Sequence, residues 1–305
     1  MDNLFFCLNA TGPIFLMMIL GLFFRHIGWM DEEFASKMNK FVFKVPLPLL
    51  LFGDLATVDF SEVWNVTLSC IIISAGISCL WKDKSIRGEF IQASYRSSAA
   101  LLGIAFIQNI YGNAGMAPVM IIGSVPLYNI MAVVVLSFFK PGQSKIDKEV
   151  LKKTLKGIIT NPIIIGIVVG LLWSACRLPF SGIPAKTVTS IGNMATPMGL
   201  MAMGATFDIH KASAKAKPSI VAAVMKLVGF AAVFLPIAVG LGFKNEEIVA
   251  ILVMLGSATT VSSYVMAKNM GHEGVLTAST VMLTTMFSAF TLTGWLYILK
   301  TLGIV

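Results

Sequence analysis

Long hydrophobic stretches recur along the whole chain and are separated by short polar segments. A stretch of about 20 apolar residues is long enough to cross the hydrocarbon core of a bilayer as a helix. We therefore predict an all-α polytopic membrane protein with ten transmembrane helices. The predicted spans are residues 10–28, 38–57, 63–81, 90–111, 116–139, 158–176, 183–207, 220–241, 247–268 and 275–299.

The centre of the ninth predicted span is crowded with small and hydroxylated residues. Non-helical backbone at membrane depth is tolerated where protein buries it or where it lines a cavity. We expect the helix to break here, and a second break around Gly103 in the fourth span to supply the other half of a solute site. The alternative is a small-residue packing face between helices. The crowded residues are Gly256, Ser257, Thr259, Thr260, Ser262 and Ser263.

Positive charge predicts the orientation. The chain is 56% hydrophobic and 12% charged, with a net charge of +8, and its Lys and Arg residues lie in short loops between spans. With the N-terminus outside, nearly all of them fall on the inner side, as cytoplasmic loops require. We expect both termini on the non-cytoplasmic side of the plasma (inner) membrane, and no nucleic acid partner. The exceptions are Arg177, Lys186, Lys244 and Lys300 outside, and Lys226 within a span.

The longest loop divides the spans into two groups of five. An odd number of spans per group forces the second group to enter the membrane upside down relative to the first. Pro46 precedes Gly53 by the same number of residues as Pro197 precedes Gly204. Both features indicate inverted repeats, a common architecture of secondary transporters. The predicted organisation is a first repeat at 1–140, a cytoplasmic linker at 141–157 and a second repeat at 158–305.

Lys226 is the charged residue predicted deepest in the membrane. It follows Lys217, where a cytoplasmic loop ends, by nine residues, or ~13 Å along a helix. A cation at that depth normally faces a partner or a wet cavity. It either neutralises an anionic solute or acts as a fixed charge where a related carrier binds a cation. The alternative is a side chain that reaches back to the cytoplasmic interface.

Other polar residues within spans complete the predicted site. Arg96 either binds a carboxylate through its fork of donors or reaches lipid phosphates, and Asp54 is either a proton-coupling group or a water-exposed boundary residue. Asn129 and Asn193 must hydrogen-bond another helix or a solute. The predicted substrate-binding residues are Ser97, Ser98, Gly103, Asn129, Asn193, Gly256, Ser257, Thr259, Thr260 and Ser263, and the predicted charge or coupling residues are Lys226, Arg96 and Asp54.

The sequence shows no constellation typical of an enzyme. The three His residues fall at loops or span ends, and the four Cys residues are scattered without a metal-ligand spacing. No glycine-rich phosphate loop is present, which disfavours ATP-driven pumping by this chain. We expect neither a cofactor nor a metal, while coupling to H⁺ or Na⁺ stays open.

Five runs of the sequence are distinctive: Asn161 to Leu171, Pro197 to Gly204, Lys226-Leu227, Val261 to Ala267 and Arg96 to Ala105. They resemble the auxin efflux carrier family, as a bacterial-type relative of the plant PIN-formed auxin carriers. The resemblance covers essentially the whole chain. The fourth span departs from the family pattern at Ser98 and Ala105, and the ninth departs at Ala258.

The resemblance implies ten helices in two inverted repeats, similar to bile acid/sodium symporter-like folds. Spans one, two, six and seven would form a scaffold through which the protein is a homodimer. Spans three to five and eight to ten would form a mobile transport domain. The unwound fourth and ninth spans would cross beside an organic anion and move with it by an elevator mechanism.

These observations predict a secondary active or facilitative carrier of a small organic anion, a carboxylate, in a lipid membrane. Helix N-termini at the two breaks would face the negative charge of the solute. The alternative is a non-transporting membrane sensor or assembly subunit that keeps the carrier fold. A long cytoplasmic effector region would favour that alternative, and the linker is too short for one.

Overall fold

A computed structural model describes residues 2–56, 74, 76–79, 81, 83–98, 107, 110–111, 117–141 and 148–305. Within them the regular structure is helical. Most of the third predicted span, 63–81, and the predicted centre of the fourth-span break, Gly103, lie outside the described residues.

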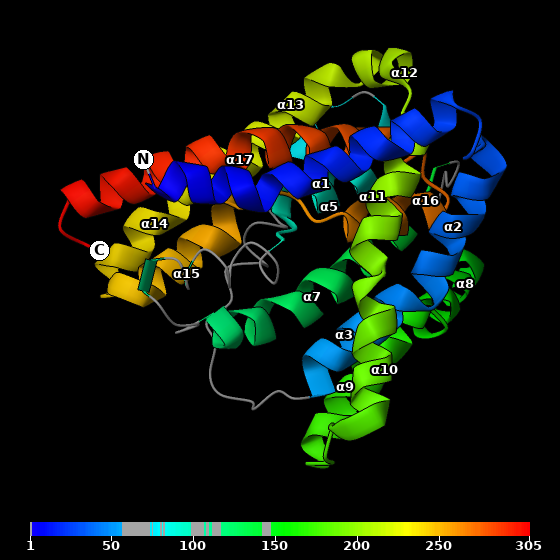
Figure 1. Cartoon of the computed structure of the whole chain (residues 1–305), viewed down its shortest axis with the longest axis horizontal. Coiled ribbons are helices and arrows are strands. Elements are labelled where there is room, and N and C mark those ends of the chain that lie inside the picture. The colour runs from blue at the N-terminus through cyan, green and yellow to red at the C-terminus, as the bar shows by residue number, and fades with distance from the viewer. Residues whose placement is uncertain are drawn as a thin grey trace.

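The helices follow one another in the order labelled in Figure 1. They are α1 (Asp2–His26), α2 (Glu32–Lys44), α3 (Pro46–Ala56), the 3₁₀ turn η1 (Lys84–Ile86), α5 (Arg87–Tyr95), α7 (Ala117–Phe138), α8 (Lys148–Ile159), α9 (Pro162–Ala175), α10 (Gly182–Asn193), α11 (Ala195–Ala205), α12 (Ile209–Ala214), α13 (Ala216–Val224), the π-helix η3 (Met225–Gly229), α14 (Phe230–Gly240), α15 (Asn245–Gly256), α16 (Ser262–Asn269) and α17 (Val275–Thr301).

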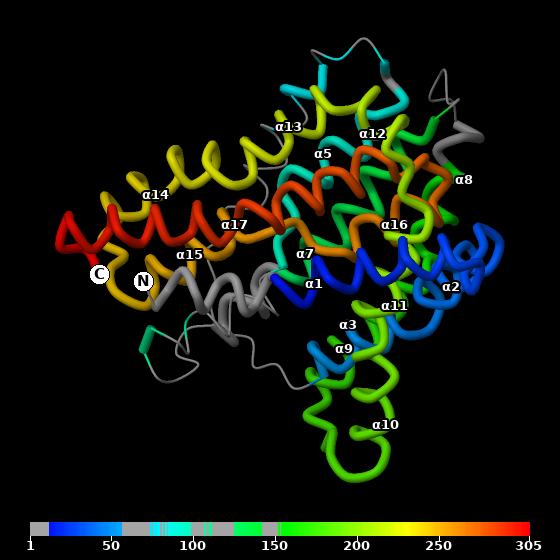
Figure 2. Tube along the Cα trace, turned by 45° about the horizontal axis from the view of Figure 1, so that its top comes forward, coloured from blue at the N-terminus to red at the C-terminus, as the bar shows by residue number. Residues whose placement is uncertain are grey.

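One group of helices packs with its backbones in close contact. Here α3 lies against α9 and α10, and α1 lies against α11. A Cβ atom at Gly204 would collide with the backbone carbonyl of Met18, and one at Gly21 would collide with that of Met201. Small residues that let two helices approach this closely are typical of membrane proteins. We call α1–α3 and α9–α11 the first helix group. Figure 2 shows that α3, α9 and α10 of this group project from the rest of the molecule.

The second helix group consists of α5, α7, α13–α17 and η3. In it α17 packs against α13, α5 and α15, while α14 packs against α15. Two continuous helices of the described chain, Ala216–Gly240 and Val275–Thr301, are long and apolar enough to cross a membrane. They lie next to each other in Figure 2, and α13 and η3 pack against α17. Helix α1 lies along α17 where the two groups meet (Figure 1).

Two spans that the hydrophobicity pattern predicts as single helices are each divided in the structure. The span 38–57 is divided at Val45, which has φ −126° and ψ −70° and precedes Pro46. A residue before proline is disfavoured in helical conformation. The span 183–207 is divided at Met194, where Pro197 has no N–H to donate to the carbonyl of Asn193. Helix α8 begins inside the predicted linker, 141–157, and ends at Ile159.

Candidate functional site

The ninth span is interrupted where small and hydroxylated residues crowd the sequence. Helix α15 ends at Gly256, and α16 begins only at Ser262. The fourth span also leaves the helix, because Arg96, directly after α5, has extended backbone angles of φ −70° and ψ 140°. We call residues 96–98 and 257–261, together with the residues that hydrogen-bond to them, the helix crossing.

The two non-helical segments contact each other directly. The backbone N–H of Ser98 donates to the carbonyl of Ala258 at 2.9 Å, and the hydroxyls of Ser97 and Ser257 lie 2.6 Å apart. Thr259 donates its hydroxyl hydrogen to the carbonyl of Ala93, in the last turn of α5, at 2.8 Å. Each segment thereby satisfies polar groups that the break exposes in the other, as backbone in a bilayer requires.

Lys226 points into this crossing from η3. Its side chain is fully buried, and its Nζ donates to the carbonyls of Met254 and Leu255 at 2.9 and 2.8 Å. A third bond of 2.9 Å reaches the hydroxyl of Ser97. The ammonium therefore lies at the C-terminal end of α15, where the partial negative charge of the helix is concentrated. It does not reach back to a membrane surface.

The π-helical turn η3 positions this lysine. Such turns are rare and occur often at functional sites, because they widen the helix locally and free a carbonyl group. The carbonyl of Leu227, next to Lys226, accepts a hydrogen bond of 3.2 Å from the indole N–H of Trp295 on α17. This hydrogen bond from α17 therefore stabilises the distorted backbone of η3.

Arg96 is the second buried cation at the crossing. Only 1% of the residue is exposed, so its guanidinium does not extend to a lipid headgroup. One terminal nitrogen donates to Asn129 Oδ1 at 2.6 Å and to Ser262 Oγ at 2.7 Å, and the other donates to Met266 Sδ at 2.9 Å. The buried Nε has no acceptor among the described residues.

The surroundings of Arg96 concentrate positive charge. In the described part of the chain, no carboxylate forms a salt bridge with Arg96. Its partner Ser262 is the first residue of α16, so the guanidinium lies beside a helix N-terminus, which carries partial positive charge of its own. An anion is the group that this arrangement would stabilise.

The other predicted residues of the crossing divide into buried and accessible ones. Ser257, Thr259 and Ser263 are buried, and the Ser263 hydroxyl has no partner among the described residues. Ser98 and Thr260 are half-buried, as is Ser262. The accessible side of the crossing is therefore formed by Ser98, Thr260 and Ser262.

Four further predicted residues occupy different places. Asn129 belongs to the crossing, because it accepts from Arg96 and donates to the carbonyl of Val125 at 2.8 Å. Gly256 is the buried last residue of α15. Asn193 is exposed at the end of α10, and Asp54 is half-buried on α3. The structure places these last two in the first helix group, not at the crossing.

Sequence reasoning missed two buried polar residues on α5. Gln92 donates to the carbonyl of Ser263 at 2.9 Å, and its position one turn before Arg96 was a signal that both share a helix face. The carboxylate of Glu89 accepts from the backbone N–H groups of Gly274 and Thr277 at 2.9 and 3.0 Å. It thus caps the N-terminus of α17.

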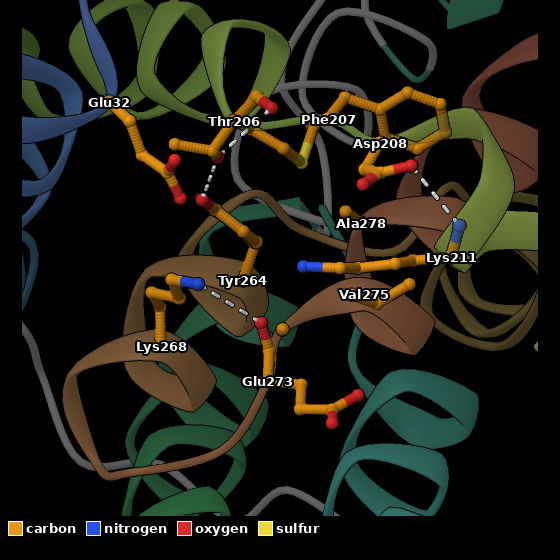
Figure 3. A pocket seen from close by; sticks show the side chains of 12 residues that line it. Glu32, Thr206, Phe207, Asp208, Lys211, Tyr264, Lys268, Glu273, Val275 and Ala278 are labelled. Carbon is orange, nitrogen blue, oxygen red and sulfur yellow. Dashed lines mark hydrogen bonds between the residues drawn. The ribbon is translucent and has the colours of Figure 1, made fainter.

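A cavity of about 150 Å³ lies between the helix groups, near the ends of α11 and α16. Figure 3 shows Tyr264 reaching toward Thr206, and their hydroxyls are 2.5 Å apart. Lys211 extends across the cavity in the same view. The hydrogen bond between Thr206 and Tyr264 therefore links the first helix group to α16 beside the crossing. The cavity is lined by Glu32, Met203, Thr206, Phe207, Asp208, Lys211, Tyr264, Lys268, Glu273, Gly274, Val275 and Ala278.

The loop between α16 and α17 carries a buried histidine, although the sequence indicated only a loop position. His272 is 5% exposed, and its Nε2 lies 2.9 Å from the carbonyl of Leu136. Burial lowers the pKa of His272 below its ordinary value of 6.5, and the positive charge of Lys140 lowers it further. The hydrogen bond to Leu136 and the negative charge of Glu89 oppose that shift.

Comparison with known proteins identifies the class of the chain. Residues 6–296 match the family described as "Membrane transport protein". A protein of Methanothermobacter thermautotrophicus described as an uncharacterized transporter is 21% identical over 210 residues, which cover 65% of this chain and 67% of that protein. The structure of a sodium proton antiporter from Methanocaldococcus jannaschii at pH 8 is similar over 92% of both chains, with a TM-score of 0.63 and 15% identity. That last likeness concerns the fold.

Proposed function

Because the chain belongs to the membrane transport protein family, the auxin efflux carrier-like family that its motifs resemble, we propose that it carries a small organic anion across the plasma (inner) membrane. The observation that supports this function best is the environment of Arg96. A fully buried guanidinium beside a helix N-terminus, with no carboxylate partner in the described chain, is an arrangement that an anionic solute completes.

The chemistry of Arg96 favours a carboxylate. A guanidinium presents planar, parallel donors that match the two oxygens of a carboxylate. The acceptors that it now uses are neutral, namely an amide oxygen, a hydroxyl and a thioether sulfur. Its Nε–H has no acceptor among the described residues, so one donor is available without breaking an existing bond. Hydroxyls at Ser98, Thr260 and Ser262 would bind further oxygens of the solute.

Elevator-type movement is part of the proposal. The second helix group, with the crossing inside it, would move relative to the first group, which would act as the scaffold of a homodimer. The close contacts between α1 and α11 favour a rigid scaffold. The bond between Thr206 and Tyr264, by contrast, links the groups through two side-chain hydroxyls, which separate at less cost than interlocked backbones.

The activity named for the similar solved structure, sodium–proton exchange, would need a site that favours cations. The described residues around Arg96 favour the opposite sign, since the hydrogen-bond acceptors of its guanidinium there are all neutral. A non-transporting sensor with the same fold remains the alternative, and flux is the property that separates the two.

Uptake of labelled mono- and dicarboxylates into proteoliposomes tests the proposal. We expect saturable uptake by the wild type and a loss of at least about tenfold in Arg96→Gln, because a lost charge-assisted bond costs more than ~1.5 kcal/mol. Arg87→Gln is the matched control, since Arg87 begins the same helix and, among the described residues, donates to the backbone carbonyls of Cys79 and Trp81. Wild-type uptake equal to that of empty vesicles across the panel would exclude the carrier function. Undiminished uptake by Arg96→Gln would exclude this site.

A further inference from the structure

We propose that the ammonium group of Lys226 takes the place of a small coupling cation, so that a cation site at the end of α15 is permanently filled by the chain itself. The proposal rests on the carrier function above and specifies how that carrier operates, since this site then needs no sodium ion for transport.

The partners of Lys226 are the kind of oxygen atoms that bind alkali cations. Two are backbone carbonyls in the last turn of α15, those of Met254 and Leu255, and the third is the hydroxyl of Ser97. In transporters with broken helices, unwound carbonyls and the C-terminal ends of half-helices coordinate the coupling ion. Here the same class of atoms surrounds an ammonium nitrogen at 2.8 to 2.9 Å.

These oxygen atoms belong to both halves of the crossing. Ser97 lies in the non-helical segment after α5 and also donates to the carbonyl of Met254 at 2.7 Å. The carbonyls of Met254 and Leu255 belong to the turn that precedes the break after Gly256. The positive charge therefore joins the two broken spans, which is the role that a bound cation would otherwise have. It also offsets the partial negative charge at the C-terminal end of α15.

The backbone of η3 and a neighbouring helix hold the lysine in this position. It lies in the π-turn η3, and Trp295 binds the carbonyl next to it. The side chain has no exposed surface, so it is a fixed part of the interior. Burying an ion is costly unless several good hydrogen bonds compensate, and the three bonds of Nζ meet that condition. An unfilled site of this kind would need a cation from solution.

Removal of the lysine should therefore expose a cation requirement. The probe is thermal unfolding of the purified full chain in sodium, potassium, ammonium or choline chloride at equal ionic strength. Lys226→Ala leaves room for a cation at the carbonyls of Met254 and Leu255. For this variant we expect a Tm at least about 3 °C higher in a small-cation salt than in choline chloride, because a ligand that binds the folded state stabilises it. For the wild type, we expect sodium and choline to give the same Tm within about 1 °C, since its site is filled.

Two further variants make the outcome specific. Lys226→Met is the matched control, because its unbranched side chain fills most of the space without a charge and should show no cation response. If Lys226→Ala does not fold, Lys226→Ser carries the same expectation, since it leaves room and adds an oxygen. Lys226→Ala with Ser97→Ala should lose most of the cation response, because one oxygen ligand is gone.

Three results would overturn the proposal. They are sodium-selective stabilisation of the wild type, a folded Lys226→Ala or Lys226→Ser that responds equally to all four salts, and a cation response in Lys226→Met as large as in Lys226→Ala. The measurement contains no organic anion, so it can fail while carboxylate uptake succeeds, and it can succeed while uptake fails.

Discussion

The backbone N–H of Ser98 donates to the backbone carbonyl of Ala258 at 2.9 Å, which joins the two interrupted spans of the described chain at their breaks. Around this bond lie two buried cations with different surroundings. Lys226 binds the carbonyl end of α15, where positive charge is favourable. Arg96 lies beside the N-terminus of α16, where positive charge is unfavourable until an anion arrives. The first therefore holds the crossing together, and the second is the residue at which we propose that the solute binds.

Ser97→Ala should weaken the crossing. The hydroxyl of Ser97 contacts Met254, Ser257 and Lys226, and its loss leaves buried polar atoms with fewer partners. We expect a destabilisation of about 1–3 kcal/mol, measured as a lower Tm of the purified protein. Ser213→Ala is the control, because the hydroxyl of Ser213 is exposed and bonds within its own helix. Equal Tm values for the two variants would contradict this role.

Glu89→Gln should destabilise the start of α17. The two carboxylate oxygens accept from the N–H groups of Gly274 and Thr277, whereas a glutamine has a single side-chain oxygen and an NH₂ group that cannot accept. One buried donor would lose its partner, at a cost of about 1–3 kcal/mol. Glu33→Gln serves for comparison, because it removes an exposed ion pair with Lys37, which is worth about 0.5 kcal/mol or less. A Tm for Glu89→Gln as high as for Glu33→Gln would show that the cap is dispensable.

Acid should destabilise the protein through His272. Because burial lowers its pKa in the folded state below 6.5, the folded state binds fewer protons than the unfolded state, and stability falls as the pH falls below that value. Charged groups that act on the ring are Glu89 and Lys140. We expect a smaller decrease in Tm between pH 7.5 and 5.5 for His272→Gln than for the wild type, while the exposed His210→Gln should behave as the wild type. An identical decrease in all three proteins would refute this.

Tyr264→Phe should increase solvent access to the cavity between the helix groups. The variant removes the hydroxyl that contacts Thr206 and keeps the ring. The equilibrium should therefore shift toward conformations in which the two helix groups are separated, by about 1 kcal/mol, or roughly fivefold. A cysteine at Ala278, which lines the cavity but is buried, should react several-fold faster with a thiol reagent in this background. Tyr297→Phe, at an exposed position of α17, is the control. Unchanged labelling would show that the contact does not restrict access.

Sequence patterns located the crossing but not its internal bonds. Small hydroxylated residues in the ninth span predicted a break, because such residues allow the backbone to unwind, and the chain is non-helical between Gly256 and Ser262. They did not indicate that the Thr259 hydroxyl would bind the carbonyl of Ala93. That bond joins residues far apart in the chain, and a periodicity along one helix carries no information about such a partner.

Local sequence also explains the interruptions that the hydrophobicity pattern missed. Pro46 and Pro197 each follow the residue at which a predicted span is divided. A hydrophobicity average treats proline as one more apolar residue, whereas its missing N–H and fixed φ interrupt the helix. Asn193, placed at membrane depth by the same average, is exposed at such an interruption.

By itself, the sequence determined the class of protein, the family and the place of the main break. These follow from hydrophobic length, charge placement and local helix propensity, which act over one or two turns. Only the tertiary structure decided which cation faces which end of a helix. Before folding, Lys226 and Arg96 are two basic residues within apolar spans. The crossing distinguishes them by placing Nζ of Lys226 at the carbonyl end of α15 and the guanidinium of Arg96 at the amide end of α16. The electrostatic role of a buried charge depends on the groups that surround it in space.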